Sequence, residues 1–542
     1  MPERPDQQSR VPDALAGAAA SPLAPSGGDR AGLELDLRAR LARNPHELAS
    51  LEQLSGLLAQ QGRFGEATEL LQRAVELAPG EQNICVTLSR MLLQRGHTEE
   101  ALDELKRLRP PFRFSFEVRT TEAGLLGILG RYAEQIDIYK KLLRRYPTDP
   151  RLWERLGNAL KYSGRTTEAV RAFQRSVKLN PAYGEGWWAL ANFKTFRFDP
   201  GDVAAMRTAF NGSLGAVDAK YMSFALGKAL EDRGEYEESF RYYAEGNRFR
   251  AAEFGPEQMN VGRVAQYVDE GIAAFDTPLF DRIRHSGYPA RDPIFVFGLQ
   301  RSGSTLIEQI LASHPLIEGI AEPDSMQHVW VELESAAVRS GRTVRDEIRG
   351  LDEQRLHEIG ADYLERSRPY RKTDRPFFVD KRPANWMYVG LIRLALPNAT
   401  IVDARRHPMA CGFSNFKQHY SGGMPYAYSL ETIGRYYAEY LRLMAHFDEV
   451  QAGSVHHLLN EALIADPETE IRRLLDFVGV PFDPACLDFH KNKRAVHTPS
   501  AEQVRRPINR DGLDQWRHYE PWLDPLKKAL GPALESWATI SS

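Results

Sequence analysis

A glycine-rich turn that follows a short apolar run is the first place in this sequence where side chains could do chemistry. Residues 293–297 are apolar and rich in β-forming types, the pattern of a buried parallel strand. A helical pattern follows the turn, and the order of strand, turn and helix aims backbone N–H groups at an anion. Gly298 and Gly303 have the spacing of a nucleotide phosphate loop, and Thr305 occupies its hydroxyl position. The turn is therefore a predicted anion site.

The turn departs from a nucleoside-triphosphate loop at one position. Ser304 stands where those loops carry the lysine that grips the β- and γ-phosphates. Arg301, inside the turn, instead offers a planar, two-pronged set of donors for an anion. A tight turn with incidental glycines is the alternative. Because the strand, the helix and the basic residue all fall where anion binding needs them, we predict that this turn binds an anion with the help of Arg301.

Two further strands are predicted to end in cationic side chains. Residues 377–381 have the pattern of a buried strand that ends at Lys381, and residues 400–404 have the same pattern and are soon followed by Arg406. Parallel α/β sheets bind ligands at the carboxyl ends of their strands, so these cations should lie near the turn. Ser414 falls about two turns into the next helix, where it can share a phosphate with Arg406. The order of these motifs predicts a second anion site.

The first half of the chain has a different pattern, a fixed period. Gly62, Gly96, Gly130 and Gly164 are each separated by 34 residues, and several alanines and prolines keep step with them. This period is the signature of tetratricopeptide repeats, in which antiparallel helix pairs stack in series. An unrelated helical bundle with coincident glycines is the alternative. We predict four regular repeats and one or two degenerate ones over residues 41–255, with a surface that binds a peptide or protein partner.

The composition excludes several broad classes of protein. The 542 residues carry 70 Lys plus Arg against 73 Asp plus Glu, a net charge of −3, which gives no global reason to bind nucleic acid. No apolar run is long enough to span a bilayer. Cys85, Cys411 and Cys486 are far apart, so we expect neither a disulfide scaffold nor a metal cluster. Residues 1–40, rich in Pro, Ala, Gly and Ser, are predicted to be a disordered leader, and the cytoplasm is the expected compartment.

Four ordered motifs carry a resemblance to a known family. The segments FVFGLQRSGSTLIEQILASHP, VDKRPANWMYVGLI, DARRHPMACGFSNF and HTPSAEQVRRPINRDGLDQW resemble sulfotransferases, and especially the bacterial fusions of tetratricopeptide repeats with a sulfotransferase domain, which are similar to tyrosylprotein sulfotransferases. The resemblance implies an α-helical tetratricopeptide solenoid followed by an α/β P-loop-like sulfotransferase domain with a parallel sheet. It also implies 3′-phosphoadenosine-5′-phosphosulfate (PAPS) as the donor of a sulfuryl group, and no metal.

The resemblance assigns donor-binding roles at the two anion sites. The phosphate loop, made of Arg301, Ser302, Gly303, Ser304 and Thr305, would wrap the 5′-phosphosulfate. Arg406 and Ser414, eight residues apart as in the family, would hold the 3′-phosphate. Ser500 matches a serine near the 5′ end of the donor. Two positions depart from the family pattern, because Asn460 stands in a run where relatives often carry tyrosine and Gln515 replaces a basic residue before a tryptophan. Both departures bear on how firmly the donor is held.

The resemblance also assigns the catalytic groups. Glu322 falls where relatives keep a catalytic glutamate, and it would take the proton of the acceptor as general base. Lys381 would sit over the bridging oxygen of the leaving phosphate and, with Arg301, would stabilise its charge. His314 and His407 are the alternative bases, but each precedes a proline, a position that usually serves a turn or a strand end.

We therefore expect a repeat array over residues 41–255, a linker over 256–289 and a sulfotransferase domain over 290–542. The expected reaction moves a sulfuryl group from PAPS to a hydroxyl-bearing acceptor, which is a peptide, carbohydrate, lipid or phenol, with protein tyrosine as one candidate. The repeats are expected to bind the acceptor or a partner protein. Two other classes stay open: a non-enzymatic repeat scaffold with a degenerate nucleotide-binding domain, and a P-loop kinase, against which the missing lysine argues.

Overall fold

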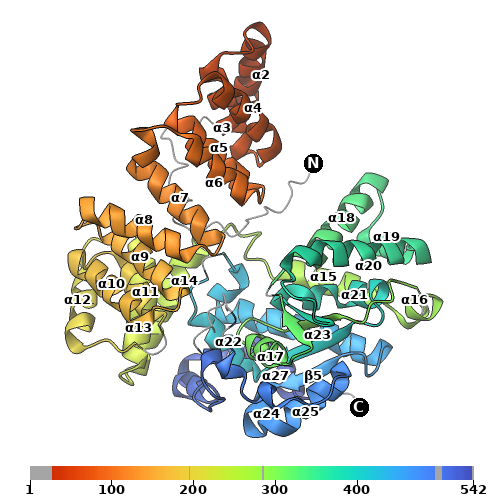
Figure 1. Cartoon of the computed structure of the whole chain (residues 1–542). Helices are drawn as coiled ribbons and strands as arrows, with labels where there is room; N and C mark the ends of the chain where they lie inside the picture. The colour runs from red at the N-terminus through yellow and green to blue at the C-terminus, as the bar shows by residue number, and fades with distance from the viewer. Residues whose placement is uncertain are drawn as a thin grey trace. The chain divides into compact units, whose positions relative to one another are not determined.

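The computed structural model describes residues 27–193, 196–283, 286–320, 322–420, 422–492, 494 and 503–539. Contacts divide the chain into two compact units, the first made of residues up to 190 with 420–423, and the second of residues 191–419 with 424–542. The part of the first unit that runs up to residue 190 is coloured red to yellow in Figure 1, and the second unit yellow to blue. No helix in these described ranges is long and apolar enough to cross a membrane.

The first unit is built from antiparallel helix pairs, as the 34-residue period predicts. Adjacent helices pack against one another in chain order, which makes each pair a neighbour of the next. The helices are α2 (Gly27–Arg43), α3 (Leu48–Gln60), α4 (Phe64–Leu77), α5 (Gln82–Gln94), α6 (Thr98–Arg107), η1 (Phe112–Phe114), α7 (Phe116–Ile128), α8 (Tyr132–Arg145), α9 (Pro150–Tyr162), α10 (Thr166–Leu179) and α11 (Gly184–Ala191).

Backbone geometry explains the recurrent glycine between the two helices of each pair. At the four periodic glycines φ is 73°, 82°, 71° and 80°. Residues other than glycine adopt this left-handed backbone conformation only at a cost in free energy. Close helix approach explains another small residue, because a Cβ atom on Gly157 would lie 2.4 Å from the Cε1 atom of Phe173. Period, turn and close approach are all properties of one repeating helix pair, so the predicted solenoid is confirmed.

The second unit contains a five-stranded parallel sheet in the order β2-β3-β1-β4-β5. The predicted strands at 293–297, 377–381 and 400–404 are all present, and the predicted α/β fold is confirmed. Two short strands that we did not predict lie at its edges. The strands are β1 (Pro293–Phe297), β2 (Ile317–Gly319), β3 (Phe377–Lys381), β4 (Thr400–Arg405) and β5 (His456–Leu459).

Both faces of this sheet are buried, which explains why its central strand β1 is a continuous apolar run. On one face Ile294 and Val296 of β1 pack in a core cluster with Ile307 of α17 (Ser304–Leu311) and Leu474 of α25 (Pro467–Val478). On the other face the ring centroid of Phe295 lies 5.1 Å from that of Tyr363 in α20 (Glu353–Ser367). The strands are thereby fixed on both sides, and so are the groups at their ends.

Helices surround the sheet, and some of them precede it in the sequence. Residues 256–289, for which we predicted a linker, include two helices, and the predicted boundaries at 255 and 290 stay predictions. The remaining helices are α12 (Pro200–Phe210), α13 (Ala216–Glu231), α14 (Tyr236–Ala251), α15 (Gly262–Ala274), α16 (Thr277–Arg282), α18 (Ser325–Ser340), α19 (Val344–Arg349), η2 (Arg368–Tyr370), η3 (Pro383–Tyr388), α21 (Val389–Ala395), α22 (Pro408–Phe416), η4 (Pro425–Tyr428), α23 (Leu430–Val450), α24 (Asn460–Ala465), η5 (Pro484–Cys486), η6 (Phe489–Lys491), η7 (Gln503–Arg505), η8 (Gln515–Trp522), α26 (Asp524–Leu530) and α27 (Ala533–Ser536).

One buried carboxyl in the sheet has an unusual protonation state. Asp380 of β3 is fully buried and accepts hydrogen bonds from the Tyr363 hydroxyl at 2.9 Å and from Asn385 Nδ2 at 3.1 Å. Burial raises the pKa of Asp380 to about 7, because the charged form loses its water and the two neutral donors only partly replace it. Folded Asp380 therefore holds its proton at pH values where an exposed aspartate has lost it.

This shift predicts how stability depends on pH. Because the folded pKa of Asp380 lies above the unfolded one, its contribution to the free energy of unfolding is fully present below about pH 4 and is lost as the pH rises through about 7. In Asp380→Asn the amide does not ionise, so the variant does not share this loss of stability. We expect the difference between the unfolding temperatures of variant and wild type to shift in favour of the variant as the pH rises from about 5 to about 8. Thermal unfolding across this range measures the difference, and a difference that does not change with pH would contradict the assignment.

Candidate active site

The described residues of the predicted site lie at or near the carboxyl-terminal edge of the sheet, because all five strands are parallel. The glycine-rich turn follows β1, the central strand, and Lys381 ends β3 beside it. Arg406 follows β4, on the other side of β1. Glu322 comes shortly after β2, and Asn460 directly follows β5. Segments that are far apart in the sequence thus bring five polar groups to the carboxyl ends of neighbouring strands.

The turn after β1 has a backbone that suits an anion. Gly298 has φ 137°, and a Cβ atom there would lie 2.3 Å from the carbonyl oxygen of Ala404, so no larger residue fits. Arg301, at φ 70°, is the one residue other than glycine with positive φ in the described ranges. Helix α17 begins directly after Gly303, which points its first backbone N–H groups toward the turn. The result is a cradle of backbone donors at a helix N-terminus.

Three of the predicted donor-binding residues contact one another around this cradle. Arg301 Nε donates to Ser414 Oγ at 3.1 Å, and Arg406 Nη1 donates to the carbonyl oxygen of Arg301 at 3.0 Å. Arg406 Nη2 also donates to the carbonyl oxygen of Gly512 at 2.5 Å. Burial lowers the pKa of Arg406 below its usual range, and the nearby Arg301 cation adds to this effect. A buried guanidinium with a cationic neighbour is a place where a bound anion would be strongly stabilised.

Two of the three predicted catalytic residues, Glu322 and Lys381, form an ion pair. Lys381 Nζ contacts Glu322 Oε1 and lies 3.9 Å from Glu308 Oε2. Glu308, on α17, in turn accepts a hydrogen bond from Arg494 Nη1 at 2.8 Å. The side chains of Lys381 and Glu308 are 1% and 2% exposed, so each charge depends on its partner. Two carboxylates and two cations alternate in this chain of contacts, which holds Lys381 between Glu322 and Glu308.

The structure gives the two alternative bases other roles. His314 Nε2 lies 2.9 Å from the carbonyl oxygen of Pro481, and its Nδ1 accepts a hydrogen bond from the backbone N–H of Leu316. The ring of His407 stacks on that of Trp516 with centroids 5.2 Å apart, and burial lowers the pKa of His407. Both rings are thus held by packing or by backbone groups. Glu322 remains the predicted base, and Ser500 lies outside the described residues.

Several contacts at this edge were missed by sequence reasoning. Glu308 lies three residues after Thr305, one turn along α17, and this helical spacing could have placed it near the cradle. Arg494 belongs to a basic run, but nothing in the sequence pairs it with a carboxylate 186 residues earlier. Gln503 Oε1 accepts a hydrogen bond from Arg301 Nη2 at 3.3 Å. Gln300, beside Arg301, contacts the Tyr426 hydroxyl through Oε1.

The two departures from the family pattern lie at informative places. Asn460 directly adjoins the cradle, because a Cβ atom on Gly303 would lie 2.8 Å from its Oδ1 atom. Gln515 Oε1 accepts a hydrogen bond from Lys417 Nζ at 3.3 Å, just after the helix that carries Ser414. Asn460 therefore borders the predicted anion site directly, whereas Gln515 contacts Lys417, which follows the helix that carries Ser414.

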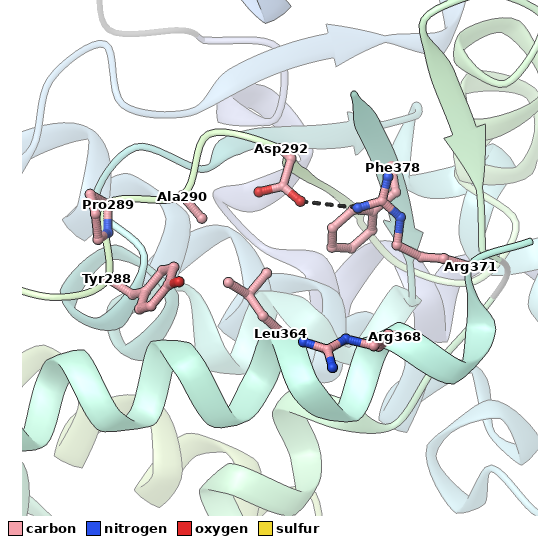
Figure 2. Close-up of a pocket in the computed structure, with 8 residues that line it drawn as sticks. All are labelled: Tyr288, Pro289, Ala290, Asp292, Leu364, Arg368, Arg371 and Phe378. Atoms are coloured by element: carbon pink, nitrogen blue, oxygen red, sulfur yellow. Dashed lines mark hydrogen bonds and ion pairs between the residues drawn. The ribbon is translucent and has the colours of Figure 1, made fainter. Parts of the chain in front are cut away.

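A hollow at the opposite edge of the sheet is a separate feature (Figure 2). Its volume is about 420 Å³, and its lining includes Tyr288, Leu364 and Phe378 with the charged groups of Asp292 and Arg371. Figure 2 shows Arg371 directed at Asp292, with a nitrogen to oxygen distance of 3.2 Å, and its guanidinium carbon lies 4.8 Å from the centroid of the Phe378 ring. Asp292 and Phe378 are at the amino ends of β1 and β3, so this hollow is not the predicted anion site.

No group of three or more His, Cys, Asp or Glu residues in the described ranges is arranged to hold a metal ion. The contacts of the candidate active site involve arginine, lysine, serine and glutamate side chains together with backbone groups. Cys85, Cys411 and Cys486 are all buried and free.

Comparisons with known proteins agree with this architecture. Residues 293–484 match the model of the sulfotransferase family, and residues 58–124 and 150–183 match models of the tetratricopeptide repeat. The sulfotransferase match includes the phosphate loop, Glu322, Lys381, Arg406 and Ser414.

Three individual proteins illustrate the similarity. An uncharacterized protein of Aquifex aeolicus is 26% identical over 559 residues, which cover 92% of this chain and 72% of that protein. Human protein O-mannosyl-transferase TMTC1 is 23% identical over 188 residues, 34% of this chain and 21% of that protein. The sulfotransferase domain of an olefin synthase from Synechococcus PCC 7002 is 21% identical, with a TM-score of 0.31, over 48% of this chain and 98% of that domain. On the family matches, the chain is a fusion of tetratricopeptide repeats with a domain of the sulfotransferase family.

Proposed function

We propose that the chain moves a sulfuryl group from PAPS to a hydroxyl-bearing acceptor, at the edge of the sheet where the glycine-rich turn ends. One observation carries the proposal: an anion cradle without the triphosphate lysine shares this edge with the Lys381–Glu322 pair. The cradle suits a phosphosulfate, and the pair supplies a base and a cation. The acceptor is a peptide, carbohydrate, lipid or phenol, and protein tyrosine is the candidate that best suits a chain with peptide-binding repeats.

Orphaned polar atoms at the site fit a bound anion. Ser302 Oγ and Arg406 Nε are buried and have no hydrogen-bond partner within the described ranges. Buried polar atoms without partners cost free energy, so a ligand that supplies acceptors would relieve that cost. Ser302 would then serve the 5′ end of the donor together with Arg301, Ser304 and Thr305. Arg406 would serve the 3′-phosphate together with Ser414.

The chemistry divides among the side chains of this chain. The donor, when bound, supplies a sulfuryl group attached to a phosphate leaving group. Glu322 would take the proton of the acceptor hydroxyl at Oε1 or Oε2, and Lys381 would place its charge beside the departing oxygen. Glu308 keeps a carboxylate near Lys381 when Glu322 becomes protonated, so the lysine remains a positioned cation. No metal ion is assigned a role in this proposal.

We propose the cytoplasm as the compartment of this reaction. Three free, buried cysteines in one chain suit a reducing compartment, where thiols persist. The repeats would bring a protein acceptor or a partner protein to the enzyme.

Product formation tests the proposed reaction. The full-length chain would be incubated with PAPS labelled with sulfur-35 in a series of separate reactions. Each reaction contains one candidate acceptor: a tyrosine peptide, a small phenol, an oligosaccharide or a hydroxylated lipid. Formation of 3′,5′-adenosine bisphosphate that depends on one acceptor, with label on that acceptor, is the expected result. Phosphoryl transfer from ATP with magnesium, without transfer from PAPS, would overturn the proposal in favour of a kinase.

A further inference from the structure

The helix pair α13–α14 resembles a repeat but packs within the second unit. Gly234 separates its two helices with φ 75°, the conformation of the periodic glycines. The contacts of α14, however, extend to α22 and η8, which belong to the sulfotransferase half of the sequence. The pair is therefore placed to act on the helix that carries Ser414.

A buried amide joins α14 to the end of α22. Asn247 is 1% exposed, and its Nδ2 atom donates to the carbonyl oxygen of Phe416 at 2.8 Å and to that of Tyr243 at 2.9 Å. The carbonyl of Phe416 is one of the last in α22, where helices leave their acceptors without intrahelical donors. Asn247 thus supplies from a neighbouring helix the donor that α22 lacks at its end.

Charge and aromatic packing reinforce the same junction. Lys417, the residue after α22, pairs with Glu231 at 2.7 Å, and the two side chains are 15% and 13% exposed. The Tyr243 hydroxyl donates to the other oxygen of Glu231 at 2.8 Å. The rings of Phe240 and Phe416 stack with centroids 5.7 Å apart. Hydrogen bond, ion pair and ring stack all join the helix pair to the last turn of α22 and the residue after it.

The other side of α22 contacts the phosphate loop. Ser414 Oγ accepts from Arg301 Nε, and Asn415 Nδ2 donates to the carbonyl oxygen of Gln300 at 2.7 Å. Ser414 is two residues from Phe416, so a shift at the end of α22 moves the serine as well. One short helix is thus held by the α13–α14 pair at its end and presents donor-site groups along its side.

We propose that the α13–α14 pair is a positioning element of the donor site, in which Asn247 and the Glu231–Lys417 pair fix α22 so that Ser414 faces Arg301 and the 3′-phosphate. The inference rests on the proposed function, because it takes Ser414 as a contact of the 3′-phosphate. It assigns to residues 216–251 a part in donor binding, in addition to any part that they have in the repeat array.

Selective loss of 3′-phosphate recognition tests this inference. In the full chain, Asn247→Ala is expected to weaken binding of 3′,5′-adenosine bisphosphate by about tenfold, the effect of losing its buried hydrogen bond to the Phe416 carbonyl. Binding of adenosine 5′-monophosphate should weaken much less. Calorimetric titration gives the ratio of the two dissociation constants. Glu231→Gln, which weakens the pair with Lys417, should change the ratio in the same direction, and it keeps the test decisive where Asn247→Ala does not fold.

A matched variant separates positioning from general destabilisation. Tyr242 lies on the same helix, but its ring contacts Phe210 of α12, with centroids 5.3 Å apart. Tyr242→Ala should lower the unfolding temperature without changing the ratio of the two dissociation constants. A ratio within twofold of wild type in both Asn247→Ala and Glu231→Gln would overturn the inference. A wild-type chain that does not prefer the bisphosphate would instead overturn the proposed donor site.

Discussion

Glu322→Gln is expected to lower kcat for sulfuryl transfer by about 10²–10⁴-fold, the usual effect of losing a general base. The amide keeps the size of the side chain and an oxygen that can contact Lys381, but it cannot accept the proton of the acceptor hydroxyl. Lys381 would remain close to Glu308, so the cation should stay in place. Affinity for 3′,5′-adenosine bisphosphate should therefore change little, and calorimetry beside steady-state kinetics measures both quantities.

Another carboxylate close in sequence provides the control for this prediction. Glu318 of β2 is buried, and its Oε1 atom accepts from the backbone N–H groups of Lys372 and Thr373. A glutamine at position 318 keeps an oxygen for these donors, so Glu318→Gln should alter stability more than turnover. A fall in kcat of less than tenfold in Glu322→Gln would mean that another group is the base.

Arg406→Ala is expected to weaken binding of 3′,5′-adenosine bisphosphate by about 10²-fold, the upper range for losing charged hydrogen bonds in a buried site. Binding of adenosine 5′-monophosphate, which lacks the 3′-phosphate, should weaken far less. Some loss is expected there too, because Arg406 also donates to the carbonyl oxygen of Arg301 in the phosphate loop. Titration of both nucleotides into wild type and variant gives the comparison.

Arg406→Lys is the matched variant for this second prediction. A lysine keeps the positive charge but loses the planar fork that contacts two carbonyl oxygens. Its affinity for the bisphosphate should fall between that of wild type and that of Arg406→Ala. Equal losses for the two nucleotides in Arg406→Ala would show that Arg406 supports the loop and does not contact a 3′-phosphate.

The elements that sequence reasoning predicted have local signals. The 34-residue period repeats a turn whose left-handed backbone favours glycine. The strands at 293–297, 377–381 and 400–404 each contain adjacent apolar residues, because both faces of the sheet are covered. Strands β2 and β5, of three and four residues, are too short for any periodic pattern to reveal. Their order in the sheet is a tertiary property.

The candidate site could likewise be predicted only where its residues have local sequence signals. Arg301 and Arg406 follow strands and Lys381 ends one, so their common edge could be inferred from the parallel sheet. The hydrogen bond between Arg301 and Ser414 could not, because it depends on how α22 packs beside the phosphate loop. Likewise, the hydrogen bond between Glu308 and Arg494 joins residues that are 186 positions apart. Contacts of this kind leave no trace in the spacing of a single sequence.

Titration of the full-length chain with 3′,5′-adenosine bisphosphate tests the identity of the donor most directly. A parallel titration with ATP and magnesium uses the same chain and instrument. We predict micromolar binding of the bisphosphate, about −8 kcal/mol, and no comparable binding of ATP. Binding of ATP with magnesium and not of the bisphosphate would contradict the sulfotransferase function. Binding of neither nucleotide would also contradict the sulfotransferase function. It would favour a repeat scaffold whose second domain no longer binds a donor.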